Sequence, residues 1–204
     1  MSVLATDDFN RASIGSNWTT ISGESAWATS GSAVAAPPST ALDSSMFYNA
    51  VTWPNDQYSQ FSIPSIGTAG SDQGAGPALR CASGARTYYR IVVSGTTGTN
   101  TWASKQVAGS YTNFASATKS GGWTTSDTAY AEIQGSSIKV RNGSGGSNII
   151  STTDSSIASG SAGMSYSSTD ASAQLDNFEG GDFAGGVTTK IKDMIGLDFV
   201  PRKR

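Results

Sequence analysis

The residue types that most often perform chemistry are sparse in this chain. Histidine is absent, which removes histidine-assisted serine or cysteine nucleophiles and histidine-ligated metals. Glycoside hydrolysis by a retaining enzyme needs two carboxyl groups about 5–5.5 Å apart. The chain has only three glutamates, and they are far apart in the sequence: Glu24, Glu132 and Glu179. The sequence therefore predicts that the protein is not an enzyme.

The single cysteine and the glycine-rich segments have simpler interpretations than catalysis. Cys81 falls in an apolar stretch, where we expect a small buried hydrophobic residue rather than a nucleophile. One cysteine also cannot form an intramolecular disulfide. Residues 143–146 lack the Lys-Ser/Thr pair and the helix of a phosphate-binding loop, so we expect a turn there.

Aromatic side chains are the remaining candidates for binding chemistry. A sugar site combines exposed rings, which stack on pyranose faces, with a few well-placed polar groups. The alternative is that such rings pack in the core or in cross-strand pairs, as aromatic residues in sheets often do. The candidate glycan-binding residues are Trp53, Tyr88 and Trp102, with Tyr89 and Tyr111 as further candidates.

The elements that must position these residues are predicted to be strands. The 204-residue chain holds 24 glycines, yet its 5 Trp, 7 Tyr and 7 Phe are spread along it, unlike the composition of a disordered chain. Apolar and polar residues alternate at 57–63, 130–134 and 138–141, which is typical of half-buried strands. About a dozen such segments between Gly-rich turns indicate an all-β sandwich formed as one domain.

Two local features of these strands can be predicted in more detail. Asn142-Gly143 is predicted to be the two-residue turn of a hairpin, because Asn-Gly tolerates positive φ at both turn positions. Residues 78–82 and 88–93 are predicted to be paired central strands. Strict alternation along the first of these would place Leu79 and Cys81 on one face.

The order of these segments resembles the concanavalin A-like (laminin G-like) jelly-roll domains found in bacteriophage and bacterial proteins. The resemblance covers about residues 6–184, through DDFNR, QYSQFSI, ALRCAS, TYYRIVVS, AEIQGSSIKVRNGS and LDNFEGGDF. It implies an antiparallel two-sheet jelly-roll sandwich in which the N- and C-terminal strands lie side by side. Asp7-Asp8-Phe9 would then be next to Leu175-Asp176-Asn177-Phe178.

The resemblance also carries expectations about sites. Glycan-cleaving members of the fold use a Glu-x-Asp-x-x-Glu cluster on a concave strand, and no glutamate of this chain begins that pattern. Many members hold a structural calcium through carboxylate and backbone oxygens. The calcium ligands implied here are Asp8 and Asp176, with Asp7 as an adjunct. The alternative is that Asp176 pairs with Arg11 or caps a turn.

Residues 185–204 depart from the resemblance and are predicted to be a flexible or short-helical basic docking tail that follows a jelly-roll domain at 1–184. Residues 187–204 carry five basic and two acidic residues, a net charge of +3. Residues 1–186 therefore carry a net charge of −5, since the whole chain carries −2. A frayed terminus is the alternative. The predicted partner-docking residues are Ile191, Met194, Ile195, Leu197, Phe199, Arg202, Lys203 and Arg204.

These observations favour a non-enzymatic virion structural protein, such as a phage capsid decoration or head/tail accessory protein. It would bind other virion proteins, or further copies of itself, through the terminal segment. The alternative is a carbohydrate-binding, lectin-like module that recognises surface glycans. The N-terminal residues lack a signal-peptide pattern, and no apolar run reaches membrane-spanning length, so we expect a virion location after synthesis in a host cytoplasm. A net charge of −2 favours neither nucleic-acid nor membrane partners.

Overall fold

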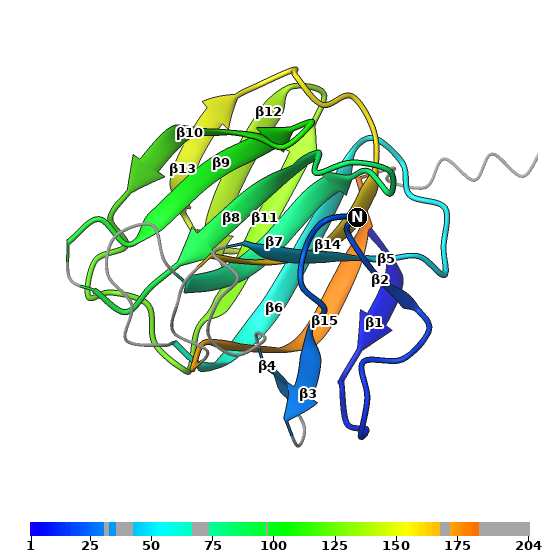
Figure 1. Cartoon of the computed structure of the whole chain (residues 1–204). Helices are drawn as coiled ribbons and strands as arrows, with labels where there is room; N and C mark the ends of the chain where they lie inside the picture. Colours follow the sequence, from blue (N-terminus) through cyan, green and yellow to red (C-terminus); the bar gives the residue numbers. More distant parts are fainter. Residues whose placement is uncertain (31–32, 36–42, 67–73, 97, 168–171, 184–204) are drawn as a thin grey trace, which may run out of the picture.

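Short alternating segments separated by Gly- and Ser-rich turns form two antiparallel sheets that pack face to face (Figure 1). This computed structural model describes residues 1–30, 33–35, 43–66, 74–96, 98–167 and 172–183. Within those ranges the secondary structure consists of strands and turns, and no helix is long and apolar enough to cross a membrane. The predicted all-β sandwich is confirmed for this part of the chain.

Sheet A has eight strands in the order β13-β12-β11-β6-β15-β4-β3, and β1 also pairs with β15. Neighbouring strands in this sheet are antiparallel. The strands are β1 (Ser2–Asp7), β3 (Ala28–Ser30), β4 (Ala33–Ala35), β6 (Gln57–Ser65), β11 (Thr128–Gln134), β12 (Ser137–Asn142), β13 (Asn148–Thr153) and β15 (Gln174–Asp182).

Sheet B has seven strands in the order β10-β9-β8-β7-β14-β5-β2, and these pairs are antiparallel as well. Its long central strands cross in front of sheet A in Figure 1. The strands are β2 (Trp18–Thr20), β5 (Ser44–Tyr48), β7 (Gly74–Cys81), β8 (Tyr88–Val93), β9 (Thr101–Val107), β10 (Ser110–Ala117) and β14 (Ser161–Ser167).

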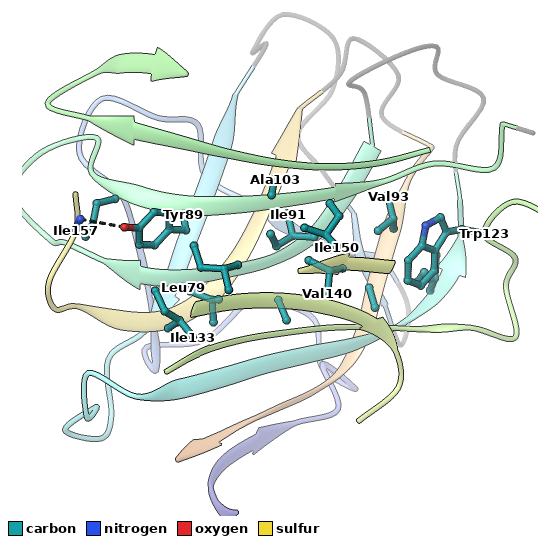
Figure 2. Close-up of a cluster of buried hydrophobic side chains, with 14 residues drawn as sticks. Leu79, Tyr89, Ile91, Val93, Ala103, Trp123, Ile133, Val140, Ile150 and Ile157 are labelled. Carbon is teal, nitrogen blue, oxygen red and sulfur yellow. Dashed lines mark hydrogen bonds between the residues drawn. The ribbon is translucent and has the colours of Figure 1, made fainter. Parts of the chain in front are cut away.

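The main hydrophobic core lies between the two sheets (Figure 2). Tyr89 and Ile91 of β8 point from sheet B toward Ile133, Val140 and Ile150 of sheet A, and all five are buried. Full burial of an aliphatic side chain contributes about 1.5–3 kcal/mol. Because every second residue of β8 enters this core, the residues between them must face away from it.

The two ends of the described chain meet in sheet A. Asp7 of β1 lies opposite Phe178 of β15, so the predicted proximity of DDF and LDNF is confirmed (Figure 1). The Asp7 carboxylate accepts hydrogen bonds from the Arg11 guanidinium, at 2.6 and 2.7 Å, and from the Trp18 indole N–H at 2.8 Å. The predicted alternative in which Arg11 pairs with Asp176 is wrong, because the Arg11 guanidinium donates to Asp7 and to the Ile14 carbonyl instead.

The hairpin predicted at Asn142-Gly143 is confirmed, but its turn is longer than the two residues predicted. Residues 143–147 connect β12 to β13, and Arg141 pairs with Asn148 across the connection. Among these turn residues only Gly143 has a positive φ, of 69°. The Asn142 side chain instead accepts a hydrogen bond from the Thr128 N–H and donates one to Asp127, which fixes the turn to β11.

A bulge in β7 overturns the predicted common face of Leu79 and Cys81. Arg80 has a φ of 50°, in the left-handed region, and this reverses the alternation after it. Leu79 therefore enters the core between the sheets, whereas Cys81 packs with Tyr88 on the opposite face. Cys81 is buried as predicted, and burial raises the pKa of its thiol.

Candidate functional site

The face of sheet B that points away from sheet A carries the candidate site, and we call it the outer face of sheet B. Its residues alternate with the core residues of β8 and β9, since Tyr89, Ile91 and Ala103 lie in the core. Arg90 of β8 lies opposite Ser104 of β9, and Gln106 of β9 lies opposite Tyr111 of β10. Adjacent strands thus place Arg90, Ser104, Gln106 and Tyr111 side by side on this face.

A buried cation forms the centre of the site. Arg90 is only 2% exposed, and its guanidinium donates to Ser104 Oγ at 3.2 Å and to the Asp43 carboxylate. Asp43 Oδ2 also accepts a hydrogen bond from Gln106 Nε2 at 3.1 Å. Burial alone would lower the pKa of Arg90, but the neighbouring Asp43 carboxylate outweighs it and raises that pKa. The guanidinium therefore stays charged and fixed in place.

Tyr111 presents an exposed ring above this cation. The ring centre lies 5.0 Å from the guanidinium carbon of Arg90, and the residue is 42% exposed. Directly opposite, Gln106 is 2% exposed, and its Oε1 atom is buried with no hydrogen-bond partner. An exposed ring beside convergent polar groups is the arrangement that sugar-binding sites use.

The five aromatic candidates for glycan binding differ in their solvent exposure. Tyr88, Tyr89 and Trp102 are buried, so the prediction that Tyr88 and Trp102 stack on a glycan is wrong for this conformation. Trp53 is half-buried, packs against the aromatic core and donates its indole N–H to the Tyr48 carbonyl at 2.8 Å. Tyr111 is the one aromatic residue in the exposed class within the described ranges.

Tyr88 has a structural partner instead of a ligand. Its hydroxyl donates to Glu24 Oε1 at 2.5 Å, and Arg86 Nε lies 3.7 Å from the same oxygen. Burial raises the pKa of Glu24, and hydrogen bonding from Tyr88 and the charge of Arg86 offset only part of this effect. Burial, followed by the Glu24 charge, likewise raises the pKa of the Tyr88 phenol. This pair holds the segment around Glu24 against the outer face of sheet B.

Sequence reasoning missed Arg90, Asp43 and Gln106 as site residues. A charged residue inside the apolar run TYYRIVV is a usable signal for Arg90, because a buried arginine requires a partner. Nothing local points to Asp43, which is 47 residues away in the chain from Arg90. Only the folded arrangement of β5 and β8 brings these two side chains together.

A second polar feature lies where β1, β15 and β6 run side by side. It is an open cleft of about 570 Å³. Phe178 is its only aromatic lining residue and is buried, so the cleft offers no ring for a sugar to stack on. The polar lining residues are Thr6, Asp7, Asp8, Arg11, Asn17, Gln60, Asn177 and Glu179.

The implied calcium ligands lie beside this cleft. Asp8 and Asp176 are close enough that Asp8 contributes to raising the pKa of Asp176, after the larger effect of burial. Ca²⁺ needs six to eight oxygen ligands. The described residues contain no group of three or more acidic, His or Cys residues placed to hold a metal, and Asp7 is occupied by Arg11 and Trp18. The calcium site at Asp8 and Asp176 therefore stays a prediction.

The other glutamates make structural contacts. Glu132 of β11 is buried and accepts both guanidinium donors of Arg141, at 2.9 and 3.0 Å. Glu179 of β15 accepts a hydrogen bond from the Tyr58 hydroxyl at 2.9 Å. The predicted docking residues, from Ile191 to Arg204, lie outside the described residues, so their role stays a prediction.

Solved structures of other proteins have a fold similar to that of this chain. The carbohydrate-binding module CBM66 from Bacillus subtilis has a TM-score of 0.57 at 19% identity, over 79% of this chain and 91% of that one. The lumenal domain of VIP36, in a Ca²⁺- and Man2-bound form, has a TM-score of 0.57 at 11% identity, over 92% and 91% of the two chains. These similarities confirm the concanavalin A-like jelly roll.

A longer protein contains a similar sandwich. The GH43 protein BlXynB from Bacillus licheniformis, in its K247S mutant form, has a TM-score of 0.64 at 13% identity. The match covers 87% of this chain but only 39% of BlXynB. No protein-family model matches this chain, and no curated protein is significantly similar to it. None of the three similar structures is named as a virion protein, so the virion role stays a prediction.

Proposed function

We propose that this protein is a carbohydrate-binding domain that holds a glycan on the outer face of sheet B at Tyr111. The observation that carries the proposal is the Tyr111 ring, exposed and supported from below by the buried Arg90 guanidinium. The partly exposed Asp43 carboxylate stands beside it and can accept hydrogen bonds from sugar hydroxyls. The carbohydrate-binding module CBM66 and the Man2-bound domain of VIP36, both similar in fold, support the same class of ligand.

The polar groups around the ring are held in position before any ligand arrives. Arg90 is bound to Asp43 and Ser104, and Gln106 is bound to Asp43, so few side-chain rotamers remain to be fixed on binding. Each immobilised side chain otherwise costs about 0.5–1.5 kcal/mol of binding free energy. A preorganised site on strands is therefore suited to a weakly hydrophobic ligand such as a sugar.

The test is a glycan array with the wild-type protein, followed by calorimetric titration of the best ligand. Tyr111→Ala should weaken binding at least about tenfold, about 1.4 kcal/mol. Tyr111→Phe should retain most of the affinity because it keeps the ring. Val3→Ala is the matched control, since Val3 is another exposed apolar residue but lies on β1 of sheet A. If Tyr111→Ala and Val3→Ala bind the ligand equally well, the proposed site is wrong.

A further inference from the structure

The charged groups around Tyr111 are already paired with one another. Arg90 is the nearest cation to the ring, and Asp43 and Ser104 occupy its donors. The next cation along the same strand region, Arg86, donates to the Gly23 carbonyl at 2.5 Å and faces Glu24. Two cations are thus matched by two carboxylates, so the described residues around Tyr111 offer no unpaired positive charge to an anionic ligand.

The accessible polar group beside the ring is an acceptor. The Asp43 side chain is 24% exposed, and its carboxylate accepts hydrogen bonds from Arg90 and from Gln106 Nε2. Gln106 Oε1 is buried, so a ligand cannot reach it. A carboxylate can accept about four hydrogen bonds, so Asp43 can still accept one from a ligand that supplies a donor.

We infer that the Tyr111 site selects neutral, hydroxyl-bearing glycans over acidic ones. This inference rests on the proposed function. A sugar hydroxyl can donate to Asp43, whereas a carboxylate or sulfate offers only acceptors. An acidic sugar at this position would lie beside Asp43, and the only buried cation there is already neutralised by that residue.

The test is a glycan array on which each neutral oligosaccharide is printed next to an acidic counterpart. Suitable pairs are mannotetraose with tetramannuronate and lactose with sialyllactose. The wild-type protein should bind at least one neutral member in a Tyr111-dependent manner. The acidic counterpart of that member should bind at least tenfold more weakly. Equal or tighter Tyr111-dependent binding of the acidic members would overturn the neutral selectivity but leave the glycan site standing. No Tyr111-dependent binding to either class would overturn the proposed function itself.

A charge added beside the ring tests the electrostatic basis separately. Asn113 lies on exposed β10, opposite Ser104, so it shares the outer face of sheet B with Tyr111. Asn113→Lys should raise the affinity for the acidic member relative to the neutral one by about fivefold or more at low salt, and added salt should reduce this gain. Asn113→Gln is the matched control and should leave the ratio unchanged. If Asn113→Lys also leaves the ratio unchanged, charge does not set the selectivity and the inference fails.

Discussion

The guanidinium carbon of Arg90 lies 5.0 Å from the centre of the Tyr111 ring. The cation is almost completely buried, whereas Tyr111 is 42% exposed, so the ring lies between a fixed charge and the surface. A cation–π contact of a desolvated arginine contributes about 2 kcal/mol. The pair therefore holds an aromatic surface in place on the outer face of sheet B.

The Arg90–Asp43 ion pair should be important for stability. Arg90→Met leaves the Asp43 carboxylate without its cation and should lower the free energy of unfolding by about 3 kcal/mol, as expected when one partner of a buried pair is removed. Urea denaturation measures this change. The double variant Arg90→Met/Asp43→Leu should lose less than the sum of the two single losses. A single-variant loss below about 1 kcal/mol would contradict the role given to this pair.

A second ion pair predicts a pH dependence. Burial raises the pKa of Asp154, but hydrogen bonds from Lys105 at 2.5 Å, Ser156 and Tyr89 outweigh it and hold that pKa well below its usual range. Stabilisation by a carboxylate with a lowered pKa is present above the unfolded value of about 3.9 and is lost as the pH falls toward the folded value. Lys105→Met should therefore cost about 2 kcal/mol at pH 7 and less at pH 2.

The matched control for this pH dependence is Lys139→Met. Lys139 also pairs with a buried carboxylate, that of Glu132, but it is more exposed than Lys105. Arg141 remains bound to Glu132 in that variant, so its loss should stay below about 0.5 kcal/mol at either pH. An equal loss for Lys105→Met at pH 7 and pH 2 would show that Asp154 is not the responsible group.

The turn between β9 and β10 offers a stabilising substitution. Ala108 and Gly109 have φ values of 50° and 84°, although alanine disfavours the left-handed region. Ala108→Asn should raise the free energy of unfolding by about 0.5–1 kcal/mol, because asparagine tolerates this conformation. That gain corresponds to a rise in Tm of about 1–4 °C for a chain of this size. Gly109→Ala should lower the Tm, and a rise would contradict the assigned turn.

The sequence predicts the sheets better than the site, for physical reasons that particular residues illustrate. Alternation marks the strand at 130–134 because Ala131 and Ile133 enter the apolar core, although Tyr130 and Glu132 between them are buried as well. The facing of Asp7 and Phe178 follows from the resemblance. The alternation fails at Leu79 and Cys81, since one left-handed residue reverses a strand face and no sequence pattern marks Arg80 for it. Tyr88 is buried by its contact with Glu24, and Arg90 pairs with Asp43. Both contacts join segments that are far apart in the chain, and hydrophobic periodicity cannot predict such contacts.

The C-terminal segment can be tested independently of the glycan site. The last strand of the described chain, β15, ends at Asp182, and Tyr111 lies in the other sheet. Deletion of residues 187–204 should therefore change the Tm by less than about 2 °C and leave glycan affinity unchanged. The sequence-based docking prediction adds that the shortened protein should no longer join its assembly. Normal assembly of the shortened protein would refute the docking role. A loss of glycan affinity would show that the C-terminal segment and the Tyr111 site are not independent.

Calorimetric titration of wild-type protein and Tyr111→Ala with the strongest array ligand tests the central claim most directly. The alanine variant should remain folded, with a Tm lower by about 4–8 °C, because it loses the cation–π contact with Arg90. The wild-type protein should bind the glycan, and the alanine variant should bind it at least tenfold more weakly. Unchanged affinity in a folded Tyr111→Ala variant would contradict a glycan site on the outer face of sheet B.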